Sequence, residues 1–255
     1  MMLIKLLGIP EDVSADGYLV DHMLEFCHWF MLLLFVGWSC FFVYLLWRFR
    51  KSNNPVAQYH GFRSKATTHV EISVVLVEAV LLIGFALPLW AKAAGRIPTD
   101  GVLPVHVTAY QFGWLFHYAG EDGKFGRRDP SLVTGSNPLG IDWSDPDSKD
   151  DVVSMNTMHV PIGQKVVVRL TSKDVIHNFA CMSLRVSRDA IPGLANPLWF
   201  TAVKEGEYDI MCGQLCGAGH SLMKGVLSVE PVDQFNTYIK TNKAAPTEQK
   251  TAVVP

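Results

Sequence analysis

The sequence predicts an N-terminal hairpin of two membrane-spanning helices followed by an all-β domain. Two long apolar runs lie within the first 95 residues, whereas the following region has short runs rich in valine, tyrosine and phenylalanine, separated by turn-forming residues. Hydrophobic residues make up 49% of the chain and charged residues 18%, a composition that can bury a core. We therefore expect the helical hairpin within residues 1–95, the all-β domain at 96–240 and a disordered tail at 241–255.

The first apolar run, residues 26–47, contains no formally charged side chain. As a helix it would be about 33 Å long, enough to cross the hydrocarbon core of a bilayer. The second run, residues 72–90, also suffices, although Glu78 lies inside it. A carboxylate at that depth is costly unless it is protonated or paired, so we expect Glu78 to face another subunit rather than lipid. A buried helical hairpin of a soluble protein is the alternative interpretation of both runs.

The charges around the two runs predict their orientation. The loop between them carries five basic residues and no acidic residue before Glu71, whereas the first 25 residues carry one lysine and five carboxylates. By the positive-inside rule the loop is cytoplasmic, and both termini and the all-β domain lie on the other side of the membrane. The first 22 residues show no apolar segment with a small-residue cleavage site, so we expect the first span to direct its own insertion.

Partial alternation of apolar and polar residues predicts the strands of a sandwich or barrel. The candidate strands are residues 105–118, 159–172, 199–212 and 224–231. Residues 119–154 are turn-rich and longer than an ordinary hairpin connection, which indicates a functional or docking excursion. A metal-binding loop, using its aspartates, is the alternative to a solvated excursion.

Charge and cysteine content argue against two classes of protein. The net charge is −2 and there is no long basic run, so a nucleic-acid partner is not expected. The five cysteines show no paired spacing of the kind found in disulfide-stabilised domains. The chain also has no C-x-x-C-H motif, so a covalently attached haem is not expected.

The segment MCGQLCGAGHSLM, residues 211–223, carries the strongest functional signal. Two thiolates, an imidazole and a thioether are soft ligands that favour copper, whereas structural zinc sites do not recruit methionine. A mononuclear blue-copper centre uses one cysteine, so the pair Cys212 and Cys216 suits two coppers bridged by two sulfurs. A redox-active disulfide between these cysteines is the alternative. Such a centre needs a second imidazole, for which His177 is a candidate. Taken alone, however, His177 is better interpreted as a satisfied sheet histidine.

Two spans, then DVIHNFACMSLRVSRDAIPG (174–193), then CGQLCGAGHSLM (212–223), resemble subunit II of the bacterial cytochrome c oxidases, in the haem-copper oxidase family. The resemblance covers nearly the whole chain and implies a cupredoxin-like fold for the all-β domain. It also implies two copper ions in a dinuclear CuA centre bridged by Cys212 and Cys216. One copper would add His177 and Met223, and the other His220 and the backbone carbonyl of Gln214.

The resemblance further implies an electron-entry subunit of a respiratory terminal oxidase in the bacterial inner membrane. Electrons would come from cytochrome c, or from a cytochrome c domain of a larger respiratory complex. They would pass to haem in subunit I, which reduces oxygen to water. Members of the family carry a glutamate that helps to bind magnesium at the interface with subunit I. This chain has Gln214 at that position, so we expect a weakened or absent magnesium site.

Three further residues gain roles from the resemblance. Phe112 occupies the position of the tryptophan that receives the electron, and Trp114 lies two residues on, so both could share one face of a strand. Core packing is the alternative for both. Glu71 matches a glutamate near the mouth of a proton-uptake channel shared with subunit I; an interfacial carboxylate without a task is the alternative.

Two competing functions use different chemistry. A copper-delivery protein would bind metal releasably, and a structural subunit II of a quinol oxidase would lack the copper ligands. The two spans argue against the first function, and the full ligand set argues against the second.

Overall fold

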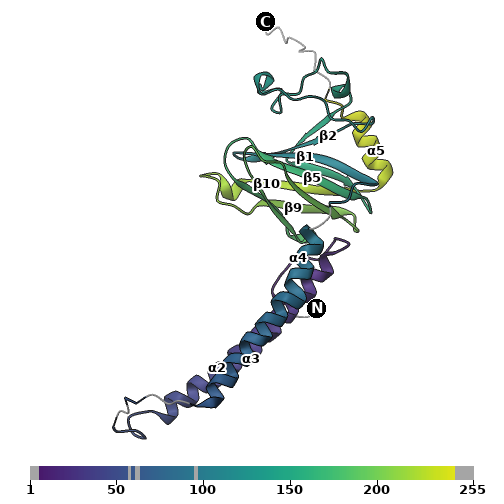
Figure 1. The fold of residues 1–255 in the computed structure, drawn as a ribbon. Coiled ribbons are helices and arrows are strands. Elements are labelled where there is room, and N and C mark those ends of the chain that lie inside the picture. Colours follow the sequence, from purple (N-terminus) through teal and green to yellow (C-terminus); the bar gives the residue numbers. More distant parts are fainter. Residues whose placement is uncertain (1–5, 57–58, 61–63, 95–96, 245–255) are drawn as a thin grey trace. The chain divides into compact units, whose positions relative to one another are not determined.

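The computed structural model describes residues 6–56, 59–60, 64–94 and 97–244, arranged in two compact units (Figure 1). One unit comprises Met1–Ile9 with Tyr18–Arg96, and the other comprises Pro10–Gly17 with Ile97–Pro255. The predicted disordered tail lies outside the described residues from position 245 onward. Positions 241–244 are described, and the backbone N–H of Ala244 donates to the carbonyl of Asp151 (2.7 Å).

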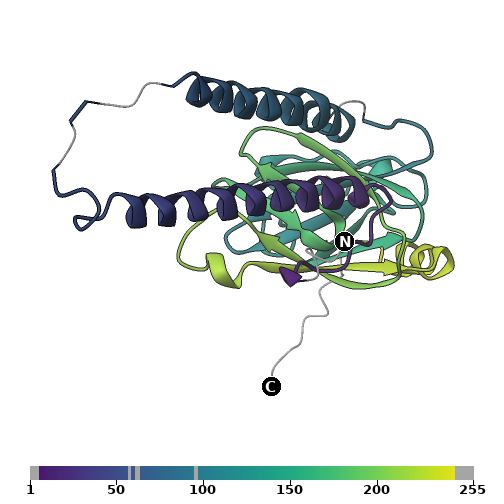
Figure 2. The same cartoon turned by 90° about the horizontal axis from the view of Figure 1, so that it is seen from below.

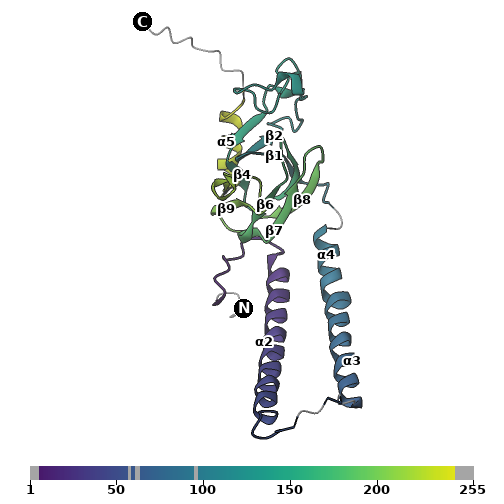
Figure 3. The same ribbon diagram turned by 90° about the vertical axis from the view of Figure 1, so that its left-hand side faces the viewer.

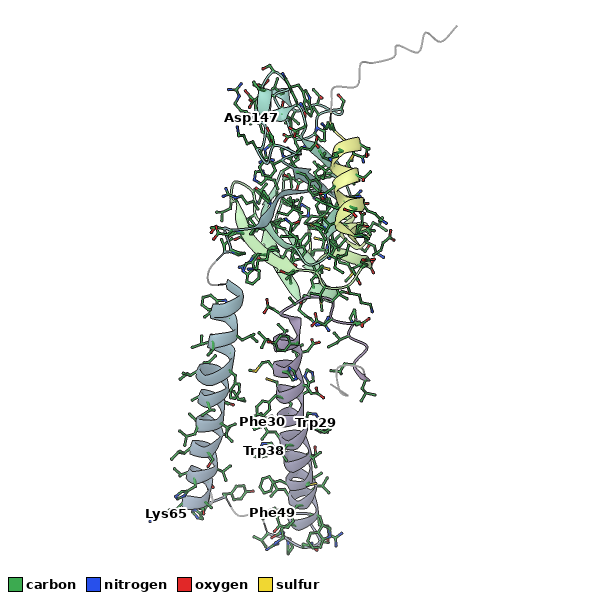
Figure 4. The ribbon with its side chains drawn as sticks, turned by 90° about the vertical axis from the view of Figure 1, so that its right-hand side faces the viewer. Trp29, Phe30, Trp38, Phe49, Lys65 and Asp147 are labelled. Atoms are coloured by element: carbon green, nitrogen blue, oxygen red, sulfur yellow. The ribbon has the colours of Figure 1, made fainter. Side chains whose placement is uncertain are left out.

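The first unit contains two helices that are long and apolar enough to cross a membrane, Gly17–Arg48 and Lys65–Ala91 (Figure 3). The first is α2 (Gly17–Arg48), and the second consists of α3 (Lys65–Val80), the π-helical segment η1 (Leu81–Ala86) and α4 (Leu87–Ala94). Both are longer than the apolar runs, because polar residues extend each helix. Ser64 caps α3 by accepting a hydrogen bond from the backbone N–H of Ala66 (3.1 Å). The side chains of α2, Trp29 and Trp38 among them, project outward from the helix (Figure 4).

A proline explains the π-helical segment. Pro88 has no N–H to offer the carbonyl four residues before it, and its ring crowds that carbonyl. The backbone N–H of Leu87 correspondingly bonds to the carbonyl of Leu82, five residues earlier. The wider turn accommodates the proline, and the helix continues through it (Figure 2).

The second unit is built from two five-stranded sheets, which confirms the predicted all-β class. The first sheet has the order β3-β2-β1-β5-β8 and the second β4-β10-β9-β6-β7. The strands are β1 (Val102–Tyr110), β2 (Gly113–Tyr118), β3 (Val152–Met155), β4 (Thr157–Pro161), β5 (Lys165–Ser172), β6 (His177–Cys181), β7 (Val186–Ala190), β8 (Asn196–Thr201), β9 (Gly206–Cys212) and β10 (Lys224–Glu230). Helix α5 (Val232–Thr241) follows the last strand.

Three of the four predicted strands were too long, because each contains a turn. The run 105–118 is the hairpin β1–β2, with Gln111 and Phe112 in the turn. The run 159–172 divides at Gly163, whose φ of +76° favours glycine. The run 199–212 divides at residues 202–205, directly before Gly206, the first residue of β9. The run 224–231 is confirmed as β10. Because Phe112 lies in the turn and Trp114 in β2, the prediction that they alternate along one strand was wrong.

The main core lies between the two sheets. Its fully buried side chains include Trp114, Phe116, Phe179, Leu170 and Leu227. Val13, from the segment before α2, is 1% exposed and belongs to the same core. Its backbone N–H donates to Ser183 (2.9 Å), and its carbonyl accepts from the N–H of Val203 (2.8 Å).

The excursion at residues 119–154 has a small core of its own. Leu139 and Ile141 pack with Leu115 of β2, and the excursion ends in β3. A buried pair holds it to the sheet, because Nε2 of His117 lies 2.8 Å from Oδ2 of Asp151 and both side chains are at most 1% exposed. Residues 121–124 and 127–136 are exposed, which fits a solvated excursion.

Candidate metal centre

The predicted ligands come from two neighbouring strands and the loop after one of them. His177 is the first residue of β6 and Cys212 the last of β9, and these strands are antiparallel partners. The loop from Gly213 to Met223 returns the chain to β10. It is closed at its base, where the N–H of Gly213 donates to Asn178 (3.0 Å) and the N–H of Cys212 to Met223 (3.3 Å). Strand pairing thus brings together residues that lie 35 positions apart.

The structure brings all six predicted donor groups together. Sγ of Cys212 lies 3.8 Å from Sγ of Cys216 and 3.9 Å from Nδ1 of His177. Nδ1 of His220 and Sδ of Met223 lie 3.6 and 3.8 Å from Sγ of Cys216, respectively. The carbonyl oxygen of Gln214 lies 3.2 Å from Sγ of Cys212. Both thiols are free.

Burial and spacing fit a metal ion. His177 is 0% exposed, Met223 1% and Cys216 4%, so water is largely excluded. Burial, helped by the neighbouring Cys212, raises the pKa of Cys216 to about 11. A thiol of that pKa becomes a thiolate at neutral pH when a cation lies beside it. Soft donors gathered in a dry site match the preferences of copper.

Two residues that the sequence analysis did not single out hold the ligands in position. Oδ1 of Asp174 lies 2.8 Å from Nε2 of His177, and Oδ2 accepts the backbone N–H of Gln111 (2.7 Å). Burial alone would raise the pKa of Asp174, but the hydrogen bonds from His177, Gln111 and Val175 bring it below its usual value. The side-chain amide of Gln111 donates to the carbonyl of Cys216 (2.6 Å). Asp174 stands three residues before His177, and that spacing was the available signal.

The two predicted electron-entry residues have different environments. Phe112 is 39% exposed and covers the loop so closely that a Cβ built on Gly219 would lie 2.5 Å from its ring. Trp114 is 0% exposed, and its ring centroid lies 6.4 Å from that of His177. Phe112 is therefore the aromatic at the surface and Trp114 the one behind the metal cluster. Glu71 and Glu78 belong to α3 in the helical unit, and both are exposed.

Comparison with known proteins points to one family. Residues 142–230 match the profile of the family described as cytochrome c oxidase subunit II, periplasmic domain. The chain is 30% identical over 229 residues to the alternative cytochrome c oxidase subunit 2 of Bradyrhizobium diazoefficiens, covering 89% of this chain and 81% of that protein. It is 28% identical over 251 residues to the cytochrome c oxidase subunit 2 of Cereibacter sphaeroides, covering 89% of this chain and 79% of that one.

A solved structure also has a sequence similar to that of this chain. It is the periplasmic domain of subunit II of the cytochrome oxidase of Bradyrhizobium japonicum, at 31% identity. The match covers 58% of this chain and 97% of that one, with a TM-score of 0.43. The predicted architecture, two apolar helices followed by an all-β domain, is confirmed.

Proposed function

The chain belongs to the cytochrome c oxidase subunit II family, and we propose that it is the electron-entry subunit of a respiratory terminal oxidase. It accepts electrons from cytochrome c, free or as a domain of a larger respiratory complex, and passes them to haem in subunit I. Oxygen is reduced to water in that partner subunit. The observation that carries the proposal is the convergence of the Cys212 and Cys216 sulfurs with His177, His220 and Met223.

Each ligand has a role in holding a copper pair. Cys212 and Cys216 would hold both coppers, His177 and Met223 would hold one of them, and His220 and the carbonyl of Gln214 would hold the other. A copper pair bound there would supply electron transfer. The protein side chains bind and orient the metals, and their burial excludes water from them. Gln214 keeps its backbone carbonyl for copper. Its side chain has no charge, so a magnesium site is weakened or absent.

The aromatic residues offer a route to the metals. Phe112 is exposed and touches the metal-binding loop, so it meets the donor protein, while Trp114 packs behind His177. The second unit (residues 10–17 and 97–255), called the β unit below, carries more acidic than basic residues. This charge suits the binding of a basic cytochrome c. Replacing Phe112 with leucine should slow electron entry from cytochrome c without loss of copper. An equal entry rate in the variant would remove Phe112 from the route.

The two membrane-length apolar helices support a location in the bacterial inner membrane. The basic loop between the helices faces the cytoplasm, and both termini and the β unit face the periplasm. Other oxidase subunits pack around the helices. Glu71, at the cytoplasmic part of α3, stands at the entrance of a proton-uptake route shared with subunit I.

Electron paramagnetic resonance with copper analysis on the purified oxidase tests the proposal. We expect two coppers per chain and a delocalised mixed-valence signal. Cys216→Ser should leave at most a localised, mononuclear signal, because one bridging sulfur is lost. Cys181→Ala is the matched control, since Cys181 is also a buried, free cysteine of the β unit but is not part of the cluster.

Other results would reassign the protein. One releasable copper per chain, with haem reduction independent of it, would favour copper delivery. A fully active oxidase without copper in this subunit would favour a structural role.

A further inference from the structure

Glu78 lies inside the apolar run of the second membrane-length helix. It is 6 residues after Ile72 and 12 residues before Trp90, the two ends of that run. At about 1.5 Å per residue, its Cα lies about 9 Å and about 18 Å along the helix from these ends, inside a bilayer core about 30 Å thick. No other acidic or basic residue lies between Ile72 and Trp90. The carboxyl therefore cannot reach an interface by extending its side chain.

This carboxyl has no partner within the described part of the chain. Glu78 is exposed, and no hydrogen bond or ion pair is formed with it among the described residues. Glu78 does not line the apolar cavity of about 580 Å³ between α2 and the second helix. From the second helix that cavity is lined by Gly84, Phe85, Pro88 and Leu89. Glu78 thus points to a surface that this chain leaves uncovered.

Lipid is a poor occupant of that surface. A carboxyl in hydrocarbon is stable only when a polar group satisfies it, and such groups in membrane proteins face other helices or water-filled cavities. The same face carries Glu71 two turns earlier, since residues seven apart stack along a helix. A polar stripe on an otherwise apolar helix is a complementary surface for a helix with its own polar side chain at matching depth.

We propose that Glu78 hydrogen-bonds a polar side chain of a transmembrane helix in a partner oxidase subunit and thereby fixes that subunit against α3. The proposal rests on the proposed function, because it needs a membrane-embedded complex. It concerns the helical unit alone and not the copper cluster.

The test uses the purified complex, with this chain affinity-tagged and the partner subunit followed as haem per chain during washes in rising detergent. Glu78→Gln keeps a hydrogen-bonding group and should retain haem as the wild type does. Glu78→Leu removes that group and should weaken retention about 3- to 30-fold, the range for an interhelical hydrogen bond. The double variant Val77→Glu with Glu78→Val has the same composition and hydropathy but turns the carboxyl about 100° around the helix. We expect it to behave as Glu78→Leu does.

Different failures have different meanings. Equal haem retention in all variants would overturn the proposal and place Glu78 against lipid. Equal loss in Glu78→Gln and Glu78→Leu would overturn the hydrogen bond in favour of an ion pair. Normal retention with turnover lost in both would overturn it in favour of proton conduction. Copper per chain is measured in every sample: a wild-type complex lacking the copper pair would sink the proposed function, and the pattern of haem retention would still be read independently.

Discussion

Nε2 of His177 lies 2.8 Å from Oδ1 of Asp174, while Nδ1 of the same ring faces the sulfur of Cys212 at 3.9 Å. The carboxylate accepts a hydrogen bond from the Nε2–H group, which leaves Nδ1 free to bind a metal. The other carboxylate oxygen accepts a hydrogen bond from the backbone N–H of Gln111. The Asp174 side chain therefore orients both the proposed ligand His177 and the turn that contains Gln111 and Phe112.

Asp174→Asn should therefore weaken copper binding without unfolding the β unit. Asparagine can still accept from His177 through its single carbonyl, but it cannot also accept from Gln111. We expect copper affinity to fall about 10- to 100-fold, the usual effect of losing a group that orients a metal ligand. Copper titration monitored by visible absorption measures this. Asp147→Asn is the control, because Asp147 lies on the excursion at residues 119–154 (labelled in Figure 4) and is not part of the metal cluster. A similar loss of copper affinity in this variant would contradict the interpretation.

Gly219→Ala should displace Phe112 and slow electron entry. The added Cβ would lie 2.5 Å from Cδ2 of Phe112, too close for the ring to keep its place. Gly219 has φ −92°, so alanine brings no backbone strain of the left-handed kind. Stopped-flow reduction by ferrocytochrome c is the measurement, with the copper signal as a check on the metal. At Gly135 a Cβ would meet nothing within 4 Å, so Gly135→Ala should react as the wild type does. Matching rates in both variants would speak against Phe112 as the entry point.

The sequence predicted some parts of the metal centre and of the fold and missed others. The spacing of Cys212, Cys216, His220 and Met223 is local, so the sequence alone indicated a soft-metal loop. His177 and Asp174 depend on the pairing of β6 with β9, which is a long-range contact, and Asp174 was missed. The strand boundaries failed where a turn uses residues with strand-like character, as at Gln111 and Phe112. Val13 was missed because a single valine before a helix carries no periodic pattern.

Asp151→Ala should destabilise the β unit, because it leaves His117 buried without its partner. The carboxylate also accepts the N–H of Gly126 (3.0 Å), so two donors lose their acceptor. Breaking a buried pair by removing one side typically costs about 3 kcal/mol. Urea unfolding would show this as a lower midpoint. The exposed Asp122→Ala serves as control, and a loss below about 1 kcal/mol in Asp151→Ala would show that the pair is not needed.

Acid should destabilise the β unit through His106. Burial, with smaller contributions from Arg128, His117 and Arg169, lowers the pKa of His106 to about 3. The unfolded chain binds this proton near pH 6.5 and the folded chain does not. The stability that His106 contributes is therefore fully present above pH 6.5 and is lost as the pH falls from 6.5 toward 3. His106→Asn removes the titration, so the difference in unfolding free energy between the two proteins should change across this window. A constant difference would contradict the assignment.

A β-unit fragment that starts near Ile97 should be less stable than the same unit in the full chain, because residues 10–17 belong to it. Val13 is 1% exposed in the core, and Ala15 donates a backbone hydrogen bond to Thr201 (3.0 Å). The fragment would expose the core where Val13 packs and leave the carbonyls of Ser183 and Thr201 without these donors. Joining residues 10–17 to Ile97 through a flexible glycine-serine linker should raise the melting temperature, and Val13→Asp in that linked protein should cancel the gain, since an unpaired carboxylate would be buried. If the fragment melts at the same temperature with and without the segment, the segment lies on the β unit without stabilising it.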